Sequence, residues 1–162
     1  MIVISDASPL ISLAKIGYLR ILRELFEKVY IPEAVYEEIV VKGKGKTGAR
    51  EVKFATWIKK KEIKDIQTCN RLIREFNLGK GEAETIVLGR EMRADCVLID
   101  EGKARDIAVS LEIPVHGTLG VLAKWCFSRE KMEKFPSLVD ELKSKKIRFS
   151  KQVYEEIEKS FK

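Results

Sequence analysis

The sequence has few of the residues that form disulfide frameworks, zinc sites or membrane spans. Its 162 residues include three cysteines and one histidine, His116. Cys69, Cys96 and Cys126 are widely spaced, which argues against a disulfide framework and a zinc site. No apolar run reaches the length of a transmembrane helix, and the N-terminus lacks the basic region and cleavage site of a signal peptide. We therefore expect a cytoplasmic protein with no membrane partner, in which a metal site would use oxygen ligands.

What is present is an ordinary apolar content and many charges. Hydrophobic residues make up 45% of the chain and charged residues 35%. The length predicts one domain that is large enough to bury a proper core. The 31 basic and 25 acidic residues give a formal net charge of +6. That balance permits a polyanionic partner such as nucleic acid without demonstrating one.

Short apolar stretches alternate with helical patterns along the chain. The expected strands cover residues 1–4, 28–31, 62–66, 94–99 and 113–115. The expected helices cover residues 9–18, 19–26, 32–41, 49–60, 70–76, 82–93, 101–111 and 121–127, with two more from 132 to the C-terminus. This alternation predicts the α/β class, as an α/β/α sandwich with a mainly parallel sheet of about four or five strands. Residues 1–162 form a single domain in this interpretation, with about 130–162 as a C-terminal helical extension.

Two of the expected strands end in an aspartate. Asp6 follows the first strand, and Asp100 follows the strand at 94–99, whose continuous apolar run is typical of a central parallel strand. Open α/β sheets bind their ligands at the carboxyl ends of the strands, so we expect these two carboxylates to lie close together. For Asp6 alone, capping of the following helix is an equally good interpretation.

Two of the expected helices add glutamates to this edge. On a wheel of about 100° per residue, Glu37 points to solvent and Glu38 borders the core, although a surface acid is the simpler interpretation of Glu38 taken alone. Glu82 and Glu84 begin a helix whose N-terminus favours anions. That helix is apolar nearly all round, so at least one of the two acids starts at a buried edge.

Carboxylates that meet at one edge of a sheet repel one another unless they are protonated or neutralised. A divalent cation such as Mg²⁺ or Mn²⁺ is the usual solution for an oxygen-only cluster. Such a site supports hydrolysis of a phosphodiester, because the metal activates water and stabilises the developing charge.

Residues 42–48, KGKGKTG, form the most flexible-looking segment of the sequence. Lys42, Lys44 and Lys46 make it a mobile cationic loop that can contact the backbone of a nucleic-acid substrate. The spacing is not that of a phosphate-binding P-loop. A solvated surface loop is the simpler interpretation.

The order of these motifs resembles the PIN-domain family over nearly the whole chain. The matching pieces are ISDASPLI (4–11), IPEAVYEEI (31–39), GEAETI (81–86), LIDE (98–101), ARDIA (104–108) and GTLG (117–120). The last pieces are similar to an uncharacterised prokaryotic subfamily with a G-T-L-G turn rather than to the commonest VapC toxins.

This resemblance implies a magnesium- or manganese-dependent endoribonuclease, often the toxin of a toxin–antitoxin pair. The implied partners are an RNA substrate, an antitoxin protein and a second copy of the chain. A homodimer is also expected because several large apolar side chains can exceed what one core buries: Val52, Trp57, Trp125 and Phe127.

Carried over residue by residue, the resemblance assigns catalysis and metal binding to four acids: Asp6, Glu38, Glu82 and Asp100. It makes Ser8 a support for the first aspartate, and Glu84 and Asp106 outer members of the cluster. The family's third acid is commonly aspartate. Here Glu82 is preferred for its offset from Asp100 and its place at the helix start, with Glu84 as the second choice.

Two other functions compete with the nuclease. One is a catalytically inactive PIN-like module that binds RNA or protein, and the other is a metal phosphohydrolase that does not act on nucleic acid. Retention of all four acids favours the nuclease over the inactive module. The basic charge balance and the lysine loop mildly favour nucleic acid over a small phosphate ester.

Overall fold

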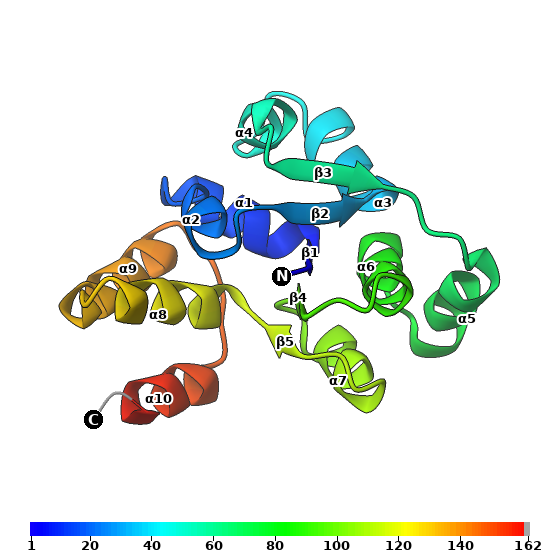
Figure 1. Cartoon of the computed structure of the whole chain (residues 1–162). Helices are drawn as coiled ribbons and strands as arrows, with labels where there is room; N and C mark the ends of the chain where they lie inside the picture. The colour runs from blue at the N-terminus through cyan, green and yellow to red at the C-terminus, as the bar shows by residue number, and fades with distance from the viewer. Residues whose placement is uncertain (161–162) are drawn as a thin grey trace.

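Five short strands form one sheet in which every neighbouring pair is parallel (Figure 1). The computed structural model describes residues 1–160. The strands are β1 (Val3–Ser5), β2 (Val29–Pro32), β3 (Ile58–Lys61), β4 (Cys96–Leu98) and β5 (Val115–His116). Their spatial order is β3-β2-β1-β4-β5, so β1 lies at the centre and β4 beside it. This arrangement confirms the predicted α/β/α sandwich with a parallel sheet.

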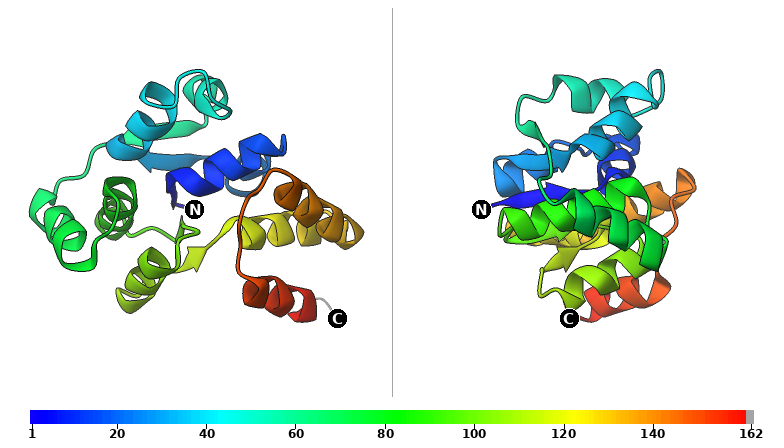
Figure 2. Two further views of the ribbon diagram at one scale, coloured as in Figure 1. Left: turned by 180° about the vertical axis from the view of Figure 1, so that it is seen from behind. Right: turned by 90° about the vertical axis from the view of Figure 1, so that its right-hand side faces the viewer.

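Helices connect the strands and cover both faces of the sheet (Figures 1 and 2). They are α1 (Ala7–Lys15), α2 (Ile21–Phe26), α3 (Glu33–Tyr36), the π-helix η1 (Glu37–Val41), α4 (Ala49–Phe54), α5 (Ile66–Phe76), α6 (Lys80–Glu91), α7 (Gly102–Ser110), α8 (Thr118–Ser128), the 3₁₀-helix η2 (Met132–Lys134), α9 (Phe135–Ser144) and α10 (Lys151–Ser160). No helix within residues 1–160 is long and apolar enough to cross a membrane. The end of the expected C-terminal extension, residues 161–162, lies outside the described residues.

The two central strands are buried on both sides. Val3 and Leu98 point into the core shared with α1, α2, α8 and α9, whereas Ile4 and Val97 point into the core shared with α5, α6 and α7. Successive side chains of a strand alternate between the faces of a sheet. A strand that is covered on both faces must therefore be apolar at every position, as the sequence of β4 is.

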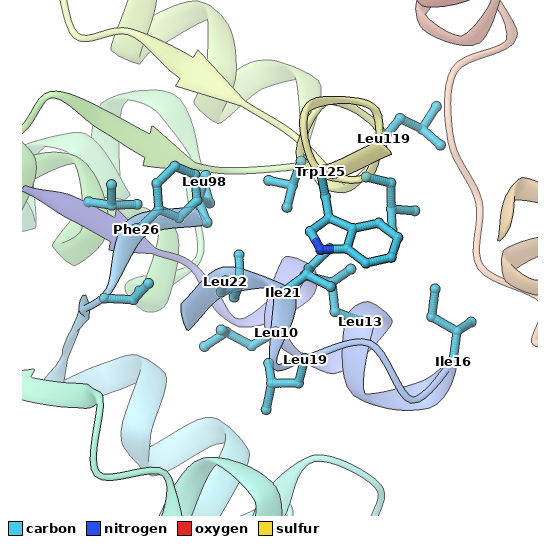
Figure 3. Packing of buried hydrophobic residues seen from close by; sticks show 14 of the residues in the cluster. Leu10, Leu13, Ile16, Leu19, Ile21, Leu22, Phe26, Leu98, Leu119 and Trp125 are labelled. Atoms are coloured by element: carbon cyan, nitrogen blue, oxygen red, sulfur yellow. The ribbon is translucent and has the colours of Figure 1, made fainter. Parts of the chain in front are cut away.

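The larger core fills the space between the sheet and the α1–α2–α8 layer (Figure 3). Trp125 of α8 packs beside Leu13 and Ile21, and its indole Nε1 donates a 2.8 Å hydrogen bond to Glu24. Four side chains of α9 belong to the same core: Phe135, Leu138, Val139 and Leu142. The first part of the expected C-terminal extension is thus joined to the main core.

Two predicted elements between β2 and α6 were wrong in their limits. The helix expected at 49–60 ends at Phe54, and the strand expected at 62–66 is instead β3, four residues earlier. Only Ile58 is buried in β3, because it is an edge strand whose three lysines are exposed. Its sequence therefore lacks the alternation that marks a strand, and pairing with β2 determines its position.

Helix α5 also begins earlier than the expected residue 70, at Ile66. Asp65 caps it by accepting hydrogen bonds from both the backbone N–H and the hydroxyl of Thr68, at 3.0 and 2.6 Å. An aspartate at the N-cap position is a recognisable start signal for a helix.

Candidate active site

The ends of β1 and β4 bring Asp6 and Asp100 to the same edge of the sheet. Ser5 pairs with Leu98, and the N–H of Asp6 donates a 2.9 Å hydrogen bond to the carbonyl of Leu98. The hydroxyl of Ser8, in the first turn of α1, donates a 2.9 Å hydrogen bond to Oδ2 of Asp100. These contacts confirm the prediction that the two strand ends are adjacent in space.

Asp6 is an almost completely buried carboxyl, with 6% of its surface exposed. Burial raises its pKa from 3.8 to about 7, against the effect of the N–H of Ala7. The charges of Glu82, Glu38 and Asp100 raise the pKa further. The other three acids of the predicted cluster are therefore all within electrostatic reach of Asp6.

The side chain of Asp6 is not used to cap the helix that follows it. Asp6 occupies the N-cap position of α1, yet its side chain accepts no cap hydrogen bond. Helix α6 packs closely against this side chain, because a β-carbon at Gly81 would lie 3.2 Å from Oδ1 of Asp6. Capping, the simpler interpretation of this aspartate, thus does not account for its burial.

Asp100 is held at the N-terminus of α8 by Thr118. The N–H of Thr118 donates to Oδ1 and its hydroxyl donates to Oδ2, each at 2.7 Å. Thr118 lies within the GTLG piece, but the sequence did not indicate this contact. Ser8 was expected to support Asp6, and the structure places its hydroxyl on Asp100 instead. The pairing of β1 with β4 brings Asp100 within reach of the Ser8 hydroxyl, which local sequence does not indicate.

Glu82 lies at the start of α6 with its two oxygens in different surroundings. Oε1 accepts a 2.9 Å hydrogen bond from the N–H of Gly79, whereas no donor group within residues 1–160 reaches the buried Oε2. Burial raises the pKa of Glu82, and the Gly79 N–H opposes this. The adjacent carboxyl of Glu101 raises the pKa again, by its charge and by the proton that the two side chains can share, and the charge of Glu38 acts in the same direction. An unpartnered buried carboxylate oxygen in an acidic cluster is a position that a cation can satisfy.

Glu101 is a fifth acid at this edge that the sequence analysis did not select. It is the N-cap residue of α7 and accepts a 2.7 Å hydrogen bond from the N–H of Ala104. Burial acts to raise its pKa, but the N–H groups of Ala104 and Lys103 hold that pKa below its usual value. Its place directly after Asp100, at the head of a helix, was the signal that could have identified it.

Two predicted outer members lie elsewhere. Glu84 is buried, and its Oε1 accepts a 3.1 Å hydrogen bond from the N–H of Ala34 at the start of α3. Asp106 is exposed on α7 and makes no hydrogen bond or ion pair within the described residues. The structure thus gives Glu84 a role in joining α6 to α3, and nothing ties Asp106 to the cluster.

The helix that carries Glu38 differs from the expected regular α-helix. It changes to a π-helix at Glu37, so the wheel of 100° per residue does not apply to this segment. Glu37 and Glu38 are both exposed, and the charge of Glu38 raises the pKa of Asp6 and of Glu82. Single π-turns within helices are frequent at functional sites. Lys42, Lys44 and Lys46 are exposed on the turns that follow.

The chemistry of these acids suits a divalent cation, although their side chains do not already form a metal cage. Within the described part of the chain, no three His, Cys, Asp or Glu side chains stand together as a metal site. The buried carboxyl of Asp6, with its pKa near 7, and the orphan Oε2 of Glu82 both favour added positive charge. The residues present therefore fit an oxygen-bound cation, and Asp100 is already oriented by Thr118 and Ser8.

The chain was also compared with known proteins. A family model described as a PIN domain matches residues 2–162. The chain therefore belongs to the PIN-domain family. PIN domains are generally nucleases and typically use divalent metals, so this is a nuclease-type fold. A comparison with curated proteins found no match.

A solved structure supports the fold of this PIN domain. A PilT N-terminus domain protein from the hyperthermophilic archaeon Sulfolobus solfataricus P2 superimposes with a TM-score of 0.54. The match covers 77% of this chain and 93% of that one at 15% sequence identity. At this identity the similarity concerns the arrangement of helices and strands alone.

Proposed function

We propose that this PIN domain is a divalent-metal-dependent endoribonuclease that uses Mg²⁺ or Mn²⁺. The observation that carries the proposal is the environment of Asp6, a buried carboxyl whose pKa is raised to about 7 by burial and by three neighbouring acids. A fold gains nothing from such a cluster, because like charges at close range destabilise it. Strongly perturbed carboxyls at the carboxyl edge of a parallel sheet are typical of functional sites.

Each acid has a role that its surroundings support. Asp6 and Asp100 would hold the cation, with Glu38 or Glu82 completing its ligands. Thr118 and Ser8 fix the orientation of Asp100 through its two oxygens. A bound divalent cation supplies charge neutralisation and a water of lowered pKa. The acids act as ligands, so even a conservative loss of charge should be damaging.

The reaction is in-line hydrolysis of the RNA backbone. Water attacks the phosphorus atom, and the bond from phosphorus to the 3′-oxygen breaks. One fragment then carries a 5′-phosphate and the other a 3′-hydroxyl. Attack by the substrate's own 2′-hydroxyl would instead leave a cyclic phosphate.

Incubation of purified protein with RNA, with and without Mn²⁺, tests the proposal. We expect cleavage that needs the metal and ends that carry a 5′-phosphate. Cyclic phosphate ends would contradict the hydrolytic mechanism. Absence of cleavage with any divalent metal would remove the nuclease itself.

An inactive PIN-like module that binds RNA or protein is the alternative function. The observation that favours it is the absence of a formed metal cage within residues 1–160. Metal titration separates the two functions. If the chain is an inactive module, the wild type should bind Mn²⁺ no better than the Asp6→Asn variant does. A role as the toxin of a toxin–antitoxin pair rests on the resemblance alone. A small open reading frame directly upstream, whose product co-purifies with this chain, would support it.

A further inference from the structure

A groove of about 690 Å³ lies between α1, the π-helix η1 and the turns that follow η1. Its charged lining consists of Lys15, Lys42, Lys46 and Glu38. Lys15 is the last residue of α1, whereas the other charged lining residues lie between positions 38 and 46. The groove therefore brings together two separate segments of the sequence. Lys44 belongs to the same lysine loop but does not line the groove.

The loop that walls the groove is built from hydrogen-bonded turns. The N–H of Lys42 donates to the carbonyl of Glu37 at 2.8 Å, and that of Lys46 donates to the carbonyl of Gly43 at 2.9 Å. Gly48, with a φ of 102°, brings the end of the loop back over α1. These contacts fix the backbone at Lys42 and Lys46 before any ligand arrives, which reduces the backbone entropy lost on binding.

The groove carries a surplus of positive charge that the chain itself does not neutralise. Three lysines and one glutamate are the charged residues of its lining. Among residues 1–160, neither Lys15, Lys42 nor Lys46 takes part in an ion pair. Clefts lined mainly by one sign of charge attract ligands of the other sign. The expected occupant is therefore an anion, and the open volume exceeds that of a single phosphate.

Glu38 connects the groove with the acid cluster. It lines the groove and also lies close enough to Asp6 and Glu82 for its charge to act on both. A strand whose phosphodiester lies at the acids can therefore continue directly into the groove. Proteins that bind single-stranded nucleic acid commonly use a positively charged groove that follows the backbone.

From this geometry, and resting on the nuclease function proposed above, we infer that the groove holds the sugar–phosphate backbone of the RNA strand next to the cleaved bond. Lys15, Lys42 and Lys46 contact its phosphates. Lysine is a compact charge that binds phosphate without reading bases, so the groove positions RNA of any sequence. The inference adds Lys15 to the predicted RNA-binding residues and leaves Lys44 out.

Binding of a fluorescein-labelled oligouridylate to the full chain, measured by anisotropy in EDTA across a salt series, tests this inference. EDTA prevents metal-dependent cleavage during the measurement. We expect Lys15→Gln, Lys42→Gln and Lys46→Gln each to weaken binding several-fold and to reduce the slope of log K against log salt by about 1. Lys44→Gln is the matched control from the same loop and should leave both quantities unchanged.

Several outcomes would overturn the inference. Among the variants, these are wild-type RNA affinity in Lys15→Gln, or a loss of affinity in Lys44→Gln equal to that in Lys42→Gln. For the wild type, they are no RNA binding, or competition by polyglutamate as strong as that by unlabelled RNA.

A parallel cleavage assay with Mn²⁺ separates the two proposals. If the wild type cleaves RNA but all the lysine variants bind RNA normally, the RNA-binding role of the groove is contradicted and the nuclease activity stands. If RNA binding depends on the lysines but no RNA is cleaved, the nuclease activity is contradicted and the groove stands as an RNA-binding site.

Discussion

Thr118 holds the carboxylate of Asp100 by both of its oxygens. Its N–H donates to Oδ1 and its hydroxyl to Oδ2, each at 2.7 Å, and Ser8 adds a third hydrogen bond to Oδ2 at 2.9 Å. The carboxylate is thus oriented by groups from α8 and α1 before any cation binds. Groups that orient a metal ligand by hydrogen bonds commonly contribute to metal affinity, and their mutation lowers it.

Thr118→Val should weaken metal binding while keeping the fold. Valine matches threonine in shape but cannot donate to Oδ2, so Asp100 loses one of its two anchors from this residue. Changes of this kind typically cost roughly 10–100-fold in metal affinity or activity. Titration calorimetry with Mn²⁺ measures the first and single-turnover cleavage the second. Thr56→Val, at an exposed threonine between α4 and β3, is the matched control. Equal Mn²⁺ affinity in both variants would show that the Thr118 hydroxyl has no such role.

Asp100→Asn should abolish cleavage and leave the fold intact. The amide removes the ligand charge, but its oxygen can still accept from the N–H of Thr118. Its NH₂ group can donate to the hydroxyls of Thr118 and Ser8, because a hydroxyl accepts as well as donates. Cleavage assays measure the loss of activity and urea unfolding the retained stability, with Asp140→Asn at an exposed position of α9 as the control. An Asp100→Asn variant that still cleaves RNA contradicts the assignment of this residue as a metal ligand.

The two glutamates of α6 should separate by function. Glu82→Gln should lower Mn²⁺ affinity and leave the fold intact, because Glu82 belongs to the acid cluster. Glu84→Ala should leave Mn²⁺ affinity unchanged and lower the free energy of unfolding by about 1–3 kcal/mol, since the N–H of Ala34 loses its acceptor. Calorimetry and urea unfolding of both variants decide the matter. Loss of metal binding in Glu84→Ala, with binding kept in Glu82→Gln, would make Glu84 the third acid.

The core of the sheet and the adjacency of the two aspartates could be predicted because local signals agreed there. The apolar run of β1 ends at Ile4, two residues before Asp6, and that of β4 continues to Ile99, directly before Asp100. Parallel strands place their carboxyl ends together. The partners of Asp100 could not be predicted, because Thr118 reaches it only through the spatial neighbourhood of β4 and β5.

The differences at β3 and η1 arise from tertiary structure in the same way. The three exposed lysines of β3 show no strand pattern, and hydrogen bonds to β2 alone make the segment extended. The π-turn at Glu37 changes the direction of every side chain that follows it. A helical wheel assumes a constant rotation per residue, so it could select Glu38 as a candidate site residue but could not predict the direction of its side chain.

A homodimer remains a prediction, and the structure changes the argument for it. Val52 and Trp125 are buried in the chain's own core, so they supply no surface for a partner. Phe127, another of the predicted residues, is 66% exposed, and further exposed apolar side chains include Val109 at 64% and Ile66 at 61% exposure. Light scattering over a range of concentrations should give twice the mass of one chain. A single-chain mass at every concentration would contradict the dimer.

The metal-free protein should lose stability as the pH rises from about 4 to about 7. The pKa of Asp6 is raised from 3.8 to about 7, so in that window the native state keeps a proton that the unfolded chain has released. The stabilisation is fully present below the unfolded pKa and is lost as the pH passes the folded pKa. A shift of about three units corresponds to on the order of 4 kcal/mol.

The comparison of wild type with Asp6→Asn isolates this effect from the other titrating groups. Asparagine carries no proton to release, so the variant should show a smaller decline, to which Glu82 still contributes because its pKa is also raised, and it should be the more stable protein at pH 8 in EDTA. Saturating Mn²⁺ should reverse the order, because only the aspartate gains a cation when it is charged. Urea unfolding at several pH values, with Asp140→Asn as control, measures the difference. If the stability of the wild type does not change between about pH 4 and pH 7, or if Asp6→Asn loses as much stability as the wild type, Asp6 is not the carboxyl whose pKa is raised.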